Sequence, residues 1–398
     1  MILRPDYMNA IKPFMDVKIV KILAGVRRSG KSTIFNMIKD ELCLKGIPLS
    51  NIIIRRYTDN IHESYNATQM YNDLKESIIS KGRCYLLLDE LQEIVGWEKV
   101  VNSLFEDEDV DIYITGSNSK LMSSEISTYL SGRYISIPVY TLSYEEYLTF
   151  KGFSRQAQND LLMEYIQYGG FPLVALNNFD THSAYQVVEG IYSSVISRDI
   201  AKRHEIRNQD LFDRVVKYII ENVGKTFSAN TIVSFLKNEK RTISVEAIYN
   251  YIKWLIEAFI VYPCSRYDLK GKSVLKTLEK YYLSDISFKY SKQGYNGSML
   301  SSILENIVFL ELKRRGYEAY VGKNYTKEID FVGINLNEKV YIQVCKELPH
   351  ESNREIDNLN DISDHYHKYV VTLDKLAKGI ENGIEIIYLG DFLLRKQW

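Results

Sequence analysis

The residues with the clearest chemistry run from Gly25 to Ser32, which read GVRRSGKS and match the pattern GxxxxGK[ST] in full. Two glycines at these positions let a loop turn its backbone N–H groups inward around phosphate oxygens, and the helix that follows adds the favourable field of its N-terminus. Lys31 can reach the β- and γ-phosphates of ATP, and the Ser32 hydroxyl can bind Mg²⁺. The residues expected to contact the nucleotide are Gly25, Arg27, Arg28, Ser29, Gly30, Lys31, Ser32 and Thr33.

Two acids follow an apolar segment further along the chain, in Leu86-Leu87-Leu88-Asp89-Glu90. If the segment is a strand, Asp89 stands at its end, where a carboxylate can hold the water shell of Mg²⁺. Glu90 is one residue further on and points elsewhere, so it can activate the water that attacks the γ-phosphate. An acidic pair after a buried strand can also be a plain solvated turn. Its place after a phosphate-binding loop favours ATP hydrolysis over nucleotide binding alone.

Two further polar groups flank candidate strands. The segment Thr115-Gly116-Ser117-Asn118 would lie beside the γ-phosphate if the strand before it neighbours both the loop strand and the Asp89 strand, and Asn118 can then orient water. The alternative is an ordinary turn capped by serine and asparagine. Arg133 directly precedes a strand, and an arginine at a subunit edge can stabilise the transition state in a neighbouring subunit. A surface arginine without such a role is the alternative.

Five short apolar runs must position these side chains. They alternate with stretches of helical apolar spacing, the first of which, residues 33–46, directly follows the phosphate-binding loop. Parallel strands need long crossover connections, so this alternation indicates an α/β fold with a parallel sheet covered on both faces. The predicted strands are residues 18–24, 51–57, 84–90, 110–117 and 134–140.

The composition is that of a globular protein without a strong charge bias. The 398 residues include 50 Lys and Arg and 51 Asp and Glu. This balance excludes a globally basic protein that coats nucleic acid, but it does not exclude a local basic patch. Hydrophobic residues make up 45%, enough to form cores and to exclude a mainly disordered chain. The four cysteines are dispersed and no run of 18 apolar residues occurs. We therefore expect a cytoplasmic protein without a disulfide framework, a zinc cluster or a membrane span.

The pattern changes from strands to helices beyond about residue 150, and a second α/β pattern begins at about residue 300. We therefore predict three domains: residues 1–150, an ATPase core; residues 151–290, a helical region; and residues 291–398, an α/β domain. Within the helical region, three helices are followed by a strand-like segment and a lysine-dotted stretch, which is the order of a winged helix. These segments are residues 211–224, 228–239, 244–259, 259–268 and 269–285.

The third of these helices has an outward face of mixed chemistry. Its apolar stripe leaves Tyr249, Asn250 and Lys253 facing out, which suits the reading of DNA bases. A wing that touches phosphates would carry Arg266, Lys270, Lys272 and Lys276. A winged helix used only for packing against protein is an equal alternative.

Several motifs together resemble a known family. They are GVRRSGKST, LLLDELQE followed by Trp97, ITGSNS, LSGR, PVYTLSYEEY and YGGFP. The chain is similar, over essentially its whole length, to prokaryotic AAA+ ATPases whose C-terminal half is classed as a domain of unknown function. The resemblance implies a five-stranded ATPase core, with Thr115 to Asn118 as sensor-like residues and Arg133 as a candidate arginine finger.

The last domain resembles the PD-(D/E)xK nuclease superfamily in the order of its polar residues. Glu305 lies on a predicted helix, Asp330 in a strand, and Gln343 and Lys346 at the end of the next strand. Asp330 and Gln343 could hold Mg²⁺, and Lys346 could position a water for phosphodiester attack. Gln343 stands where the usual residue is Glu, which removes one charge from the metal site. The alternatives are a nuclease-like fold without activity and a different α/β domain.

We therefore expect an Mg²⁺-dependent ATP hydrolase that acts on DNA and self-associates when it binds ATP. One alternative is a nucleotide-dependent switch that contacts protein partners. Another is a nuclease that ATP regulates.

Overall fold

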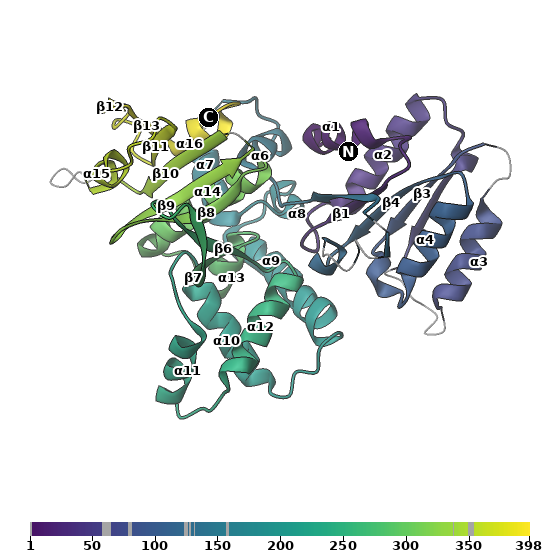
Figure 1. Ribbon diagram of the computed structural model, residues 1–398, viewed down its shortest axis with the longest axis horizontal. Helices are drawn as coiled ribbons and strands as arrows, with labels where there is room; N and C mark the ends of the chain where they lie inside the picture. Colours follow the sequence, from purple (N-terminus) through teal and green to yellow (C-terminus); the bar gives the residue numbers. More distant parts are fainter. Residues whose placement is uncertain are drawn as a thin grey trace. The chain divides into compact units, whose positions relative to one another are not determined.

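The computed structural model describes residues 2–57, 65–78, 82–122, 126, 129–130, 132–156, 159–336, 338–348 and 354–398. The chain divides into two compact units (Figure 1). Unit 1 comprises Met1–Val139 and Glu257–Phe259, and unit 2 comprises Tyr140–Ile256 and Ile260–Trp398.

Unit 1 contains the predicted parallel sheet. All five strands pair in parallel, in the order β2-β3-β4-β1-β5, so the prediction of an α/β fold with a parallel sheet is confirmed. Each strand lies inside the range that the sequence predicted. The strands are β1 (Val20–Ala24), β2 (Ile52–Arg56), β3 (Cys84–Asp89), β4 (Val110–Gly116) and β5 (Tyr134–Pro138).

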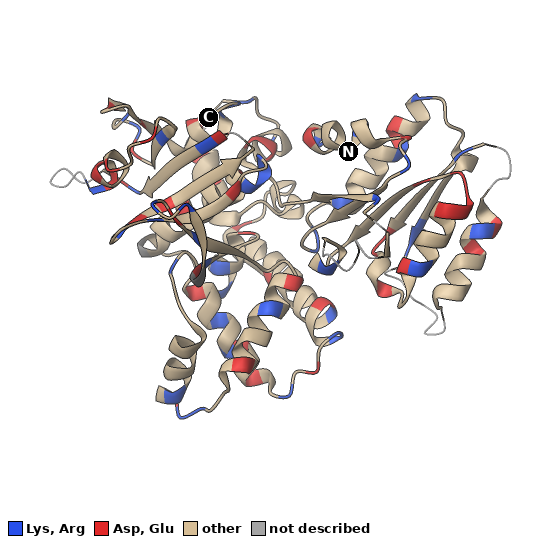
Figure 2. Cartoon of the chain, in the orientation of Figure 1, with Lys and Arg blue, Asp and Glu red and all other residues tan. Residues whose placement is uncertain are grey.

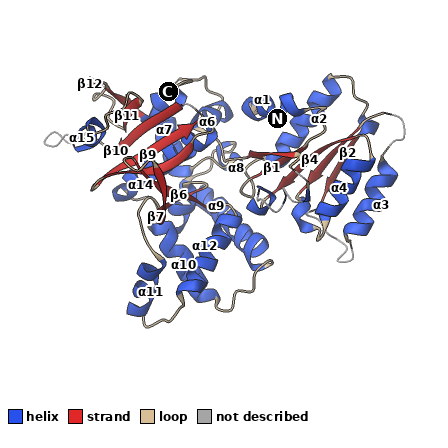
Figure 3. Ribbon diagram, viewed as in Figure 1, coloured by secondary structure: helices blue, strands red, loops and turns tan. Residues whose placement is uncertain are grey.

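Helices cover both faces of this sheet (Figure 3). Right-handed crossovers place α2 on one face and α3 and α4 on the other, because the chain first crosses to the far edge at β2 and then returns. Apolar residues of α1 and α2 pack with Leu23, Leu87 and Tyr113 of the strands in one core. The helices of unit 1 are α1 (Pro5–Ile11), α2 (Lys31–Leu44), α3 (Ala67–Ser77) and α4 (Trp97–Asp107).

Unit 2 begins with helices. The long helix α9 runs directly into one turn of π-helix, Ile196–Ala201. Buried apolar stripes on α10 and α11 come from the expected three-residue and four-residue spacing. The helices are α6 (Tyr144–Phe150), α7 (Asn159–Tyr168), α8 (Pro172–Ala175), α9 (Thr181–Val195), α10 (Gln209–Glu221), α11 (Ala229–Asn238), α12 (Val245–Glu257), α13 (Ser287–Gln293), α14 (Leu300–Arg314), α15 (Arg354–Asn360) and α16 (Leu389–Leu394).

An eight-stranded mixed sheet forms the other part of unit 2, in the order β12-β13-β11-β10-β9-β8-β6-β7. Strands β8 to β13 of this sheet lie where the sequence predicted a second α/β domain. The strands are β6 (Val261–Asp268), β7 (Ser273–Leu283), β8 (Glu318–Asn324), β9 (Lys327–Asn335), β10 (Glu338–Cys345), β11 (His367–Thr372), β12 (Gly379–Glu381) and β13 (Ile384–Tyr388).

The hairpin of β6 and β7 belongs to this same sheet, because β6 pairs in parallel with β8 from Arg266 to Asp268. The hairpin that the sequence assigned to a wing is thus continuous with the strands assigned to the third domain. Helix α6, which the sequence placed in the first domain, lies in unit 2, where it packs against α7, α8 and α16. In the described ranges, no helix is both long and apolar enough to cross a membrane.

Candidate functional site

The loop between β1 and α2 has the path that a phosphate-binding loop needs. Gly30 has a φ of 101°, in the left-handed region that favours glycine, and α2 begins at the next residue, Lys31. A Cβ on Gly25 would lie 2.0 Å from the carbonyl oxygen of Val139. The backbone path therefore requires both glycines, and α2 directs its N-terminus, the end that favours anions, toward the loop.

Lys31 extends back along this loop. Its Nζ donates to the carbonyl oxygens of Gly25 (2.9 Å) and Val26 (3.1 Å), and it lies 3.7 Å from Oε1 of Glu90. The side chain is buried. The ammonium thus stands between the loop and the acid expected to activate water, where it can bind a phosphate by exchanging its carbonyl partners.

Asp89, the last residue of β3, is held by two hydroxyl groups. Ser32 Oγ donates to its Oδ2 at 2.8 Å, and Thr115 Oγ1 donates to its Oδ1. Arg56 Nε lies 3.8 Å from Oδ2. A carboxylate beside a serine hydroxyl supplies the hard oxygen ligands that Mg²⁺ prefers, so Ser32 and Asp89 fit the metal that the motif implies.

Glu90 follows in a constrained conformation. It is a non-glycine residue in the left-handed region, with a φ of 56°, and its N–H donates to Thr115 Oγ1 at 3.1 Å. Its Oε2 accepts from Gln92 Nε2 at 2.5 Å and from Ser117 Oγ at 3.0 Å. The backbone and the two hydrogen bonds hold the carboxylate in one orientation, as a general base requires.

The charge state of Glu90 follows from its neighbours. Burial alone would raise the pKa of this carboxyl. The charges of Lys31 and Arg27 and the hydrogen bonds from Gln92 and Ser117 outweigh burial and lower the pKa below its usual value. Glu90 is therefore a carboxylate at neutral pH, the form that can accept a proton from water.

The strand order explains why these side chains meet. Strand β4 lies between β1 and β3, so Thr115 and Ser117 at its end stand beside the two acids. Asn118 is buried, and its Oδ1 accepts from the backbone N–H of Lys120 at 2.8 Å, so it caps the turn. Gln92 was missed by the sequence reasoning, although its position two residues after Glu90 is a usable signal.

The other residues of the loop differ in exposure. Arg27 is buried, Arg28 is exposed with a φ of 67°, and Thr33 lies in the first turn of α2. The carbonyl oxygen of Ser29 accepts from Nη1 of the fully buried Arg4 at 2.8 Å. Arg4 thus braces the loop from the N-terminal segment, and no spacing motif indicated it.

Arg133 lies at the opposite end of the sheet from the phosphate-binding loop. Its carbonyl accepts from the N–H of Val20, the first residue of β1, whereas the loop follows the last residue of that strand. The guanidinium pairs with Glu106 and lies 5.0 Å from the ring centroid of Phe105. Arg133 therefore does not reach the nucleotide site of its own chain.

In unit 2, an ion cluster gathers around Lys280 of β7. The buried ammonium lies 3.3 Å from Oε2 of Glu305 on α14 and 2.9 Å from Oε1 of Glu328 on β9. Burial raises the pKa of Asp330 to about 8, repulsion by Glu305 adds to the rise, and attraction by Lys280 opposes it. The fold thus brings together Glu305 and Asp330, two of the predicted residues, with a lysine that the sequence reasoning missed.

The other two predicted residues of unit 2 have different partners. Gln343 is buried, its Oε1 accepts from the N–H of Asp330 at 2.7 Å, and its Nε2 donates to the carbonyl of Glu328 at 3.4 Å. Lys346 Nζ lies 2.9 Å from Oε1 of Glu347, and 54% of its side chain is exposed. Among the residues that the structure describes, no three His, Cys, Asp or Glu side chains form a group able to hold a metal ion.

Known proteins resemble this chain along most of its length. Residues 18–148 match the family model of an AAA domain, and residues 159–297 match a domain of unknown function, DUF8612. An uncharacterized protein of Haemophilus influenzae is 37% identical over 399 residues, which cover 99% of this chain and 99% of that one. An uncharacterized protein of Methanocaldococcus jannaschii is 30% identical over 350 residues, 84% of this chain and 76% of that one.

Among solved structures, a Walker-type ATPase of Pyrococcus abyssi has a similar fold. The TM-score is 0.52 at 13% sequence identity, over 73% of this chain and 95% of that one. The AAA match and this fold agree with the resemblance to AAA+ ATPases that the motifs indicated. The winged-helix and nuclease-like assignments in the rest of the chain stay predictions.

Proposed function

We propose that this chain, which contains an AAA domain and belongs to one family with the uncharacterized proteins of Haemophilus influenzae and Methanocaldococcus jannaschii, hydrolyses ATP at the carboxyl edge of its five-stranded sheet. We further propose that it uses the hydrolysis to act on DNA. One observation carries the hydrolysis: the ionised Glu90 is held by Gln92 and Ser117 at 3.7 Å from the Lys31 ammonium. The four cysteines form no disulfide, which suits a protein of the cytoplasm.

The chemistry divides among the residues of this edge. The loop amides and Lys31 bind the phosphates, and Ser32 and Asp89 hold Mg²⁺, which neutralises phosphate charge when it is bound. Glu90 accepts a proton from water as the water oxygen bonds to the γ-phosphorus and the bond to the β–γ bridging oxygen breaks. The products are ADP and inorganic phosphate. Thr115 and Ser117 position the two acids through the hydrogen bonds described above.

The proposal of DNA as the substrate rests on unit 2. Helices α10 to α12 followed by the hairpin of β6 and β7 have winged-helix order. On α12, Tyr249 is 59% exposed, and Asn250 and Lys253 are also exposed. Lys270 and Lys272 are exposed in the turn between β6 and β7. An aromatic ring, an amide and several lysines suit contacts to bases and phosphates.

Reversing the charge of both Lys270 and Lys272, by substitution with Glu, is expected to weaken DNA binding by about tenfold or more at low salt. The slope of log affinity against log salt concentration should become less negative by about 2. Each phosphate contact releases about one counterion on binding, and two contacts are lost. Fluorescence anisotropy over a salt series measures both quantities. The matched control reverses Lys375 and Lys378, which lie near the ring of Tyr388. Equal affinities of the wild-type protein and the Lys270/Lys272 variant for every DNA would exclude the hairpin as the contact.

We also propose that ATP promotes self-association and that Arg133 acts in a neighbouring subunit. The guanidinium lies at the end of the sheet away from its own loop, so only a second copy can bring it to a nucleotide. An arginine donated in this way contributes about 1,000-fold or more to turnover. The Arg133→Ala protein should therefore turn over ATP about 1,000-fold more slowly or worse, while its own phosphate-binding loop stays intact.

Mixing Arg133→Ala protein with Lys31→Ala protein should restore part of the ATP turnover, because the second protein supplies the arginine to the intact loop of the first. Steady-state phosphate release measures the rescue. As a control, Arg133→Ala protein mixed with a Lys31→Ala/Arg133→Ala double variant should show no rescue. A protein that stays monomeric at micromolar concentration with ATP and turns over fully would contradict the proposal.

A nucleotide-dependent switch that contacts proteins is the second candidate, and the surface of unit 2 favours it. Basic and acidic residues are interspersed along helices α10 to α12 (Figure 2). Phe235, Val245 and Tyr249 of α11 and α12 are 38%, 36% and 59% exposed. Apolar exposure of this kind suits a protein partner as well as DNA bases. DNA-stimulated ATP turnover distinguishes the two candidates.

A further inference from the structure

The ammonium group of Lys280 lies among the acids of unit 2, in a position that a metal ion could also occupy. It lies on β7, is 5% exposed, and reaches Glu305 on α14 and Glu328 on β9, which come from distant parts of the chain. Acids that converge in a protein interior need a positive charge, and either a bound cation or a basic side chain can supply it. Here the ammonium of Lys280 supplies it.

The acids of the cluster have further partners within the chain. Oε2 of Glu305 also accepts from the Tyr282 hydroxyl at 3.0 Å. Oδ2 of Asp330 accepts from the N–H of Val344 at 2.8 Å. The amide oxygen of Gln343 is bound by the N–H of Asp330. One oxygen each of Glu305 and Asp330 and the amide oxygen of Gln343 thus have partners within the fold besides Lys280.

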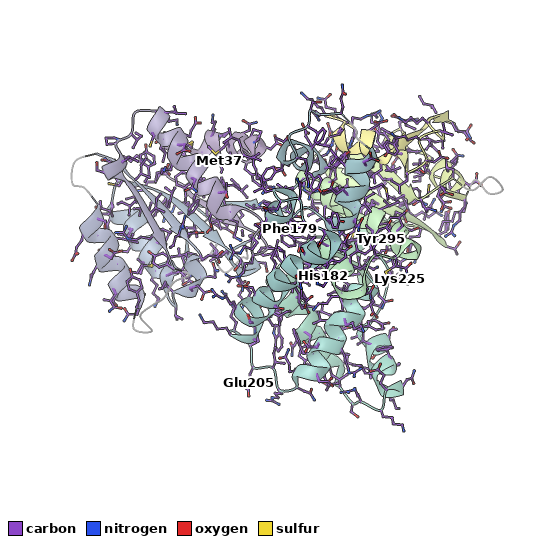
Figure 4. The ribbon with its side chains drawn as sticks, turned by 180° about the vertical axis from the view of Figure 1, so that it is seen from behind. Met37, Phe179, His182, Glu205, Lys225 and Tyr295 are labelled. Atoms are coloured by element: carbon purple, nitrogen blue, oxygen red, sulfur yellow. The ribbon has the colours of Figure 1, made fainter. Side chains whose placement is uncertain are left out.

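The loop after α10 covers the cluster from the side of the helices. Thr226 forms an isolated β-bridge with Lys280, and the N–H of Gly224 donates to the carbonyl of Tyr281 at 3.1 Å. A Cβ on Gly224 would lie 3.4 Å from Oε2 of Glu305. Lys225, which lies between Gly224 and Thr226 in the sequence, marks this loop in Figure 4. The loop therefore lies against the Lys280 and Glu305 side of the cluster.

We propose that the ammonium of Lys280 is the resident cation of the Glu305, Glu328 and Asp330 cluster, in place of a divalent metal. The cluster joins α14 to strands β7 and β9 of the sheet and does not cleave phosphodiesters. The lysine that the nuclease pattern indicates, Lys346, pairs with Glu347 at the surface instead. This role of Lys280 holds whether the helices bind DNA or a protein.

The first test is a titration of nucleotide-free protein with Mn²⁺, followed by electron paramagnetic resonance. Wild-type protein and the Asp330→Asn variant should bind the same amount of Mn²⁺, because the cluster has no metal site to lose. Neither protein should cleave DNA in Mn²⁺. A bound Mn²⁺ that disappears in Asp330→Asn, or DNA cleavage lost with that change, would overturn the proposal.

The second test compares two lysines by thermal unfolding. Lys280→Met should lower the unfolding midpoint by about 10 °C, because it leaves the partly buried Glu305 and Glu328 without their cation. Lys346→Met, the matched control, should change the midpoint by no more than about 1 °C, because that lysine forms an exposed pair. Equal midpoints for the two variants would contradict the proposal.

A double variant tells whether the effect depends on charge or on packing. Adding Glu305→Gln to Lys280→Met should raise the unfolding midpoint part of the way back toward that of the wild-type protein, because one uncompensated charge is removed. If Glu305→Gln lowers the unfolding midpoint of Lys280→Met further, Lys280 does not act as a counter-ion to Glu305. If Lys280→Met alone does not fold, recovery of a folded protein by the double variant supports the proposal, and failure to recover it contradicts it.

Discussion

Replacing Glu90 with Gln is expected to lower ATP turnover by about 100-fold or more and to leave ATP binding intact. The amide keeps the size of the side chain but cannot accept the proton of the attacking water, and loss of a general base typically costs about 10² to 10⁴ in rate. Lys31 and the loop amides, which bind the phosphates, are unchanged. Phosphate release and binding of a fluorescent ATP analogue measure the two effects.

The pH dependence of turnover gives a second view of Glu90. Its pKa is lowered in the folded protein, so the carboxylate is the form present at neutral pH. Turnover governed by this group should be constant around neutral pH and should fall only as the pH drops through the lowered pKa. Glu93→Gln, a change of the same type in the next turn, should leave both rate and profile unaltered. Wild-type turnover in Glu90→Gln would remove Glu90 from the mechanism.

Gly25→Ala is expected to abolish nucleotide binding and to destabilise unit 1 by about 3 kcal/mol. The added Cβ would lie 2.0 Å from the carbonyl oxygen of Val139, whose N–H donates to the carbonyl of Ala24 at 2.7 Å. Both sides of the contact are backbone, so neither can turn away, and the first turn of the loop must open. Differential scanning calorimetry with and without ATP measures both effects.

Gly190 provides the matched control for this substitution. It lies inside α9, and a Cβ there would meet nothing within 4 Å. Gly190→Ala should therefore stabilise the protein by about 0.5 to 1 kcal/mol through the higher helix propensity of alanine. If Gly25→Ala binds ATP as the wild-type protein does, the loop does not hold phosphate in the way described.

The fold of unit 1 was predictable because its signals are local. The glycines, Lys31 and Ser32 are neighbours in sequence, and strands that alternate with helices leave few sheet arrangements. The same reasoning reached Asp89 and Glu90 through their place at a strand end. The role of Arg4 could not be predicted. Arg4 donates to the carbonyl oxygen of Ser29, 25 residues away, and no spacing rule connects an N-terminal arginine with that loop.

Unit 2 was predictable element by element but not in its assembly. The strands were found by their apolar runs, but pairing of β6 with β8 depends on contacts across more than 50 residues, which a sequence pattern does not contain. The pairing of Lys280 with Glu305, 25 residues away, also has no signature in the sequence pattern. Lys346 fitted a motif by spacing alone, and its ammonium pairs instead with the adjacent Glu347. The π-helical turn at Ile196–Ala201 has no signature in the apolar spacing.

The most direct test of the central claim, that ATP hydrolysis in unit 1 serves action on DNA through unit 2, is steady-state phosphate release from ATP and Mg²⁺ as single-stranded, duplex or branched DNA is added. The account predicts turnover that requires Mg²⁺ and Glu90, that rises with at least one of these DNAs, and that loses the rise at high salt. Turnover that none of the DNAs changes would contradict action on DNA and favour a protein partner, and a chain that releases no phosphate under any of these conditions would contradict the hydrolysis itself.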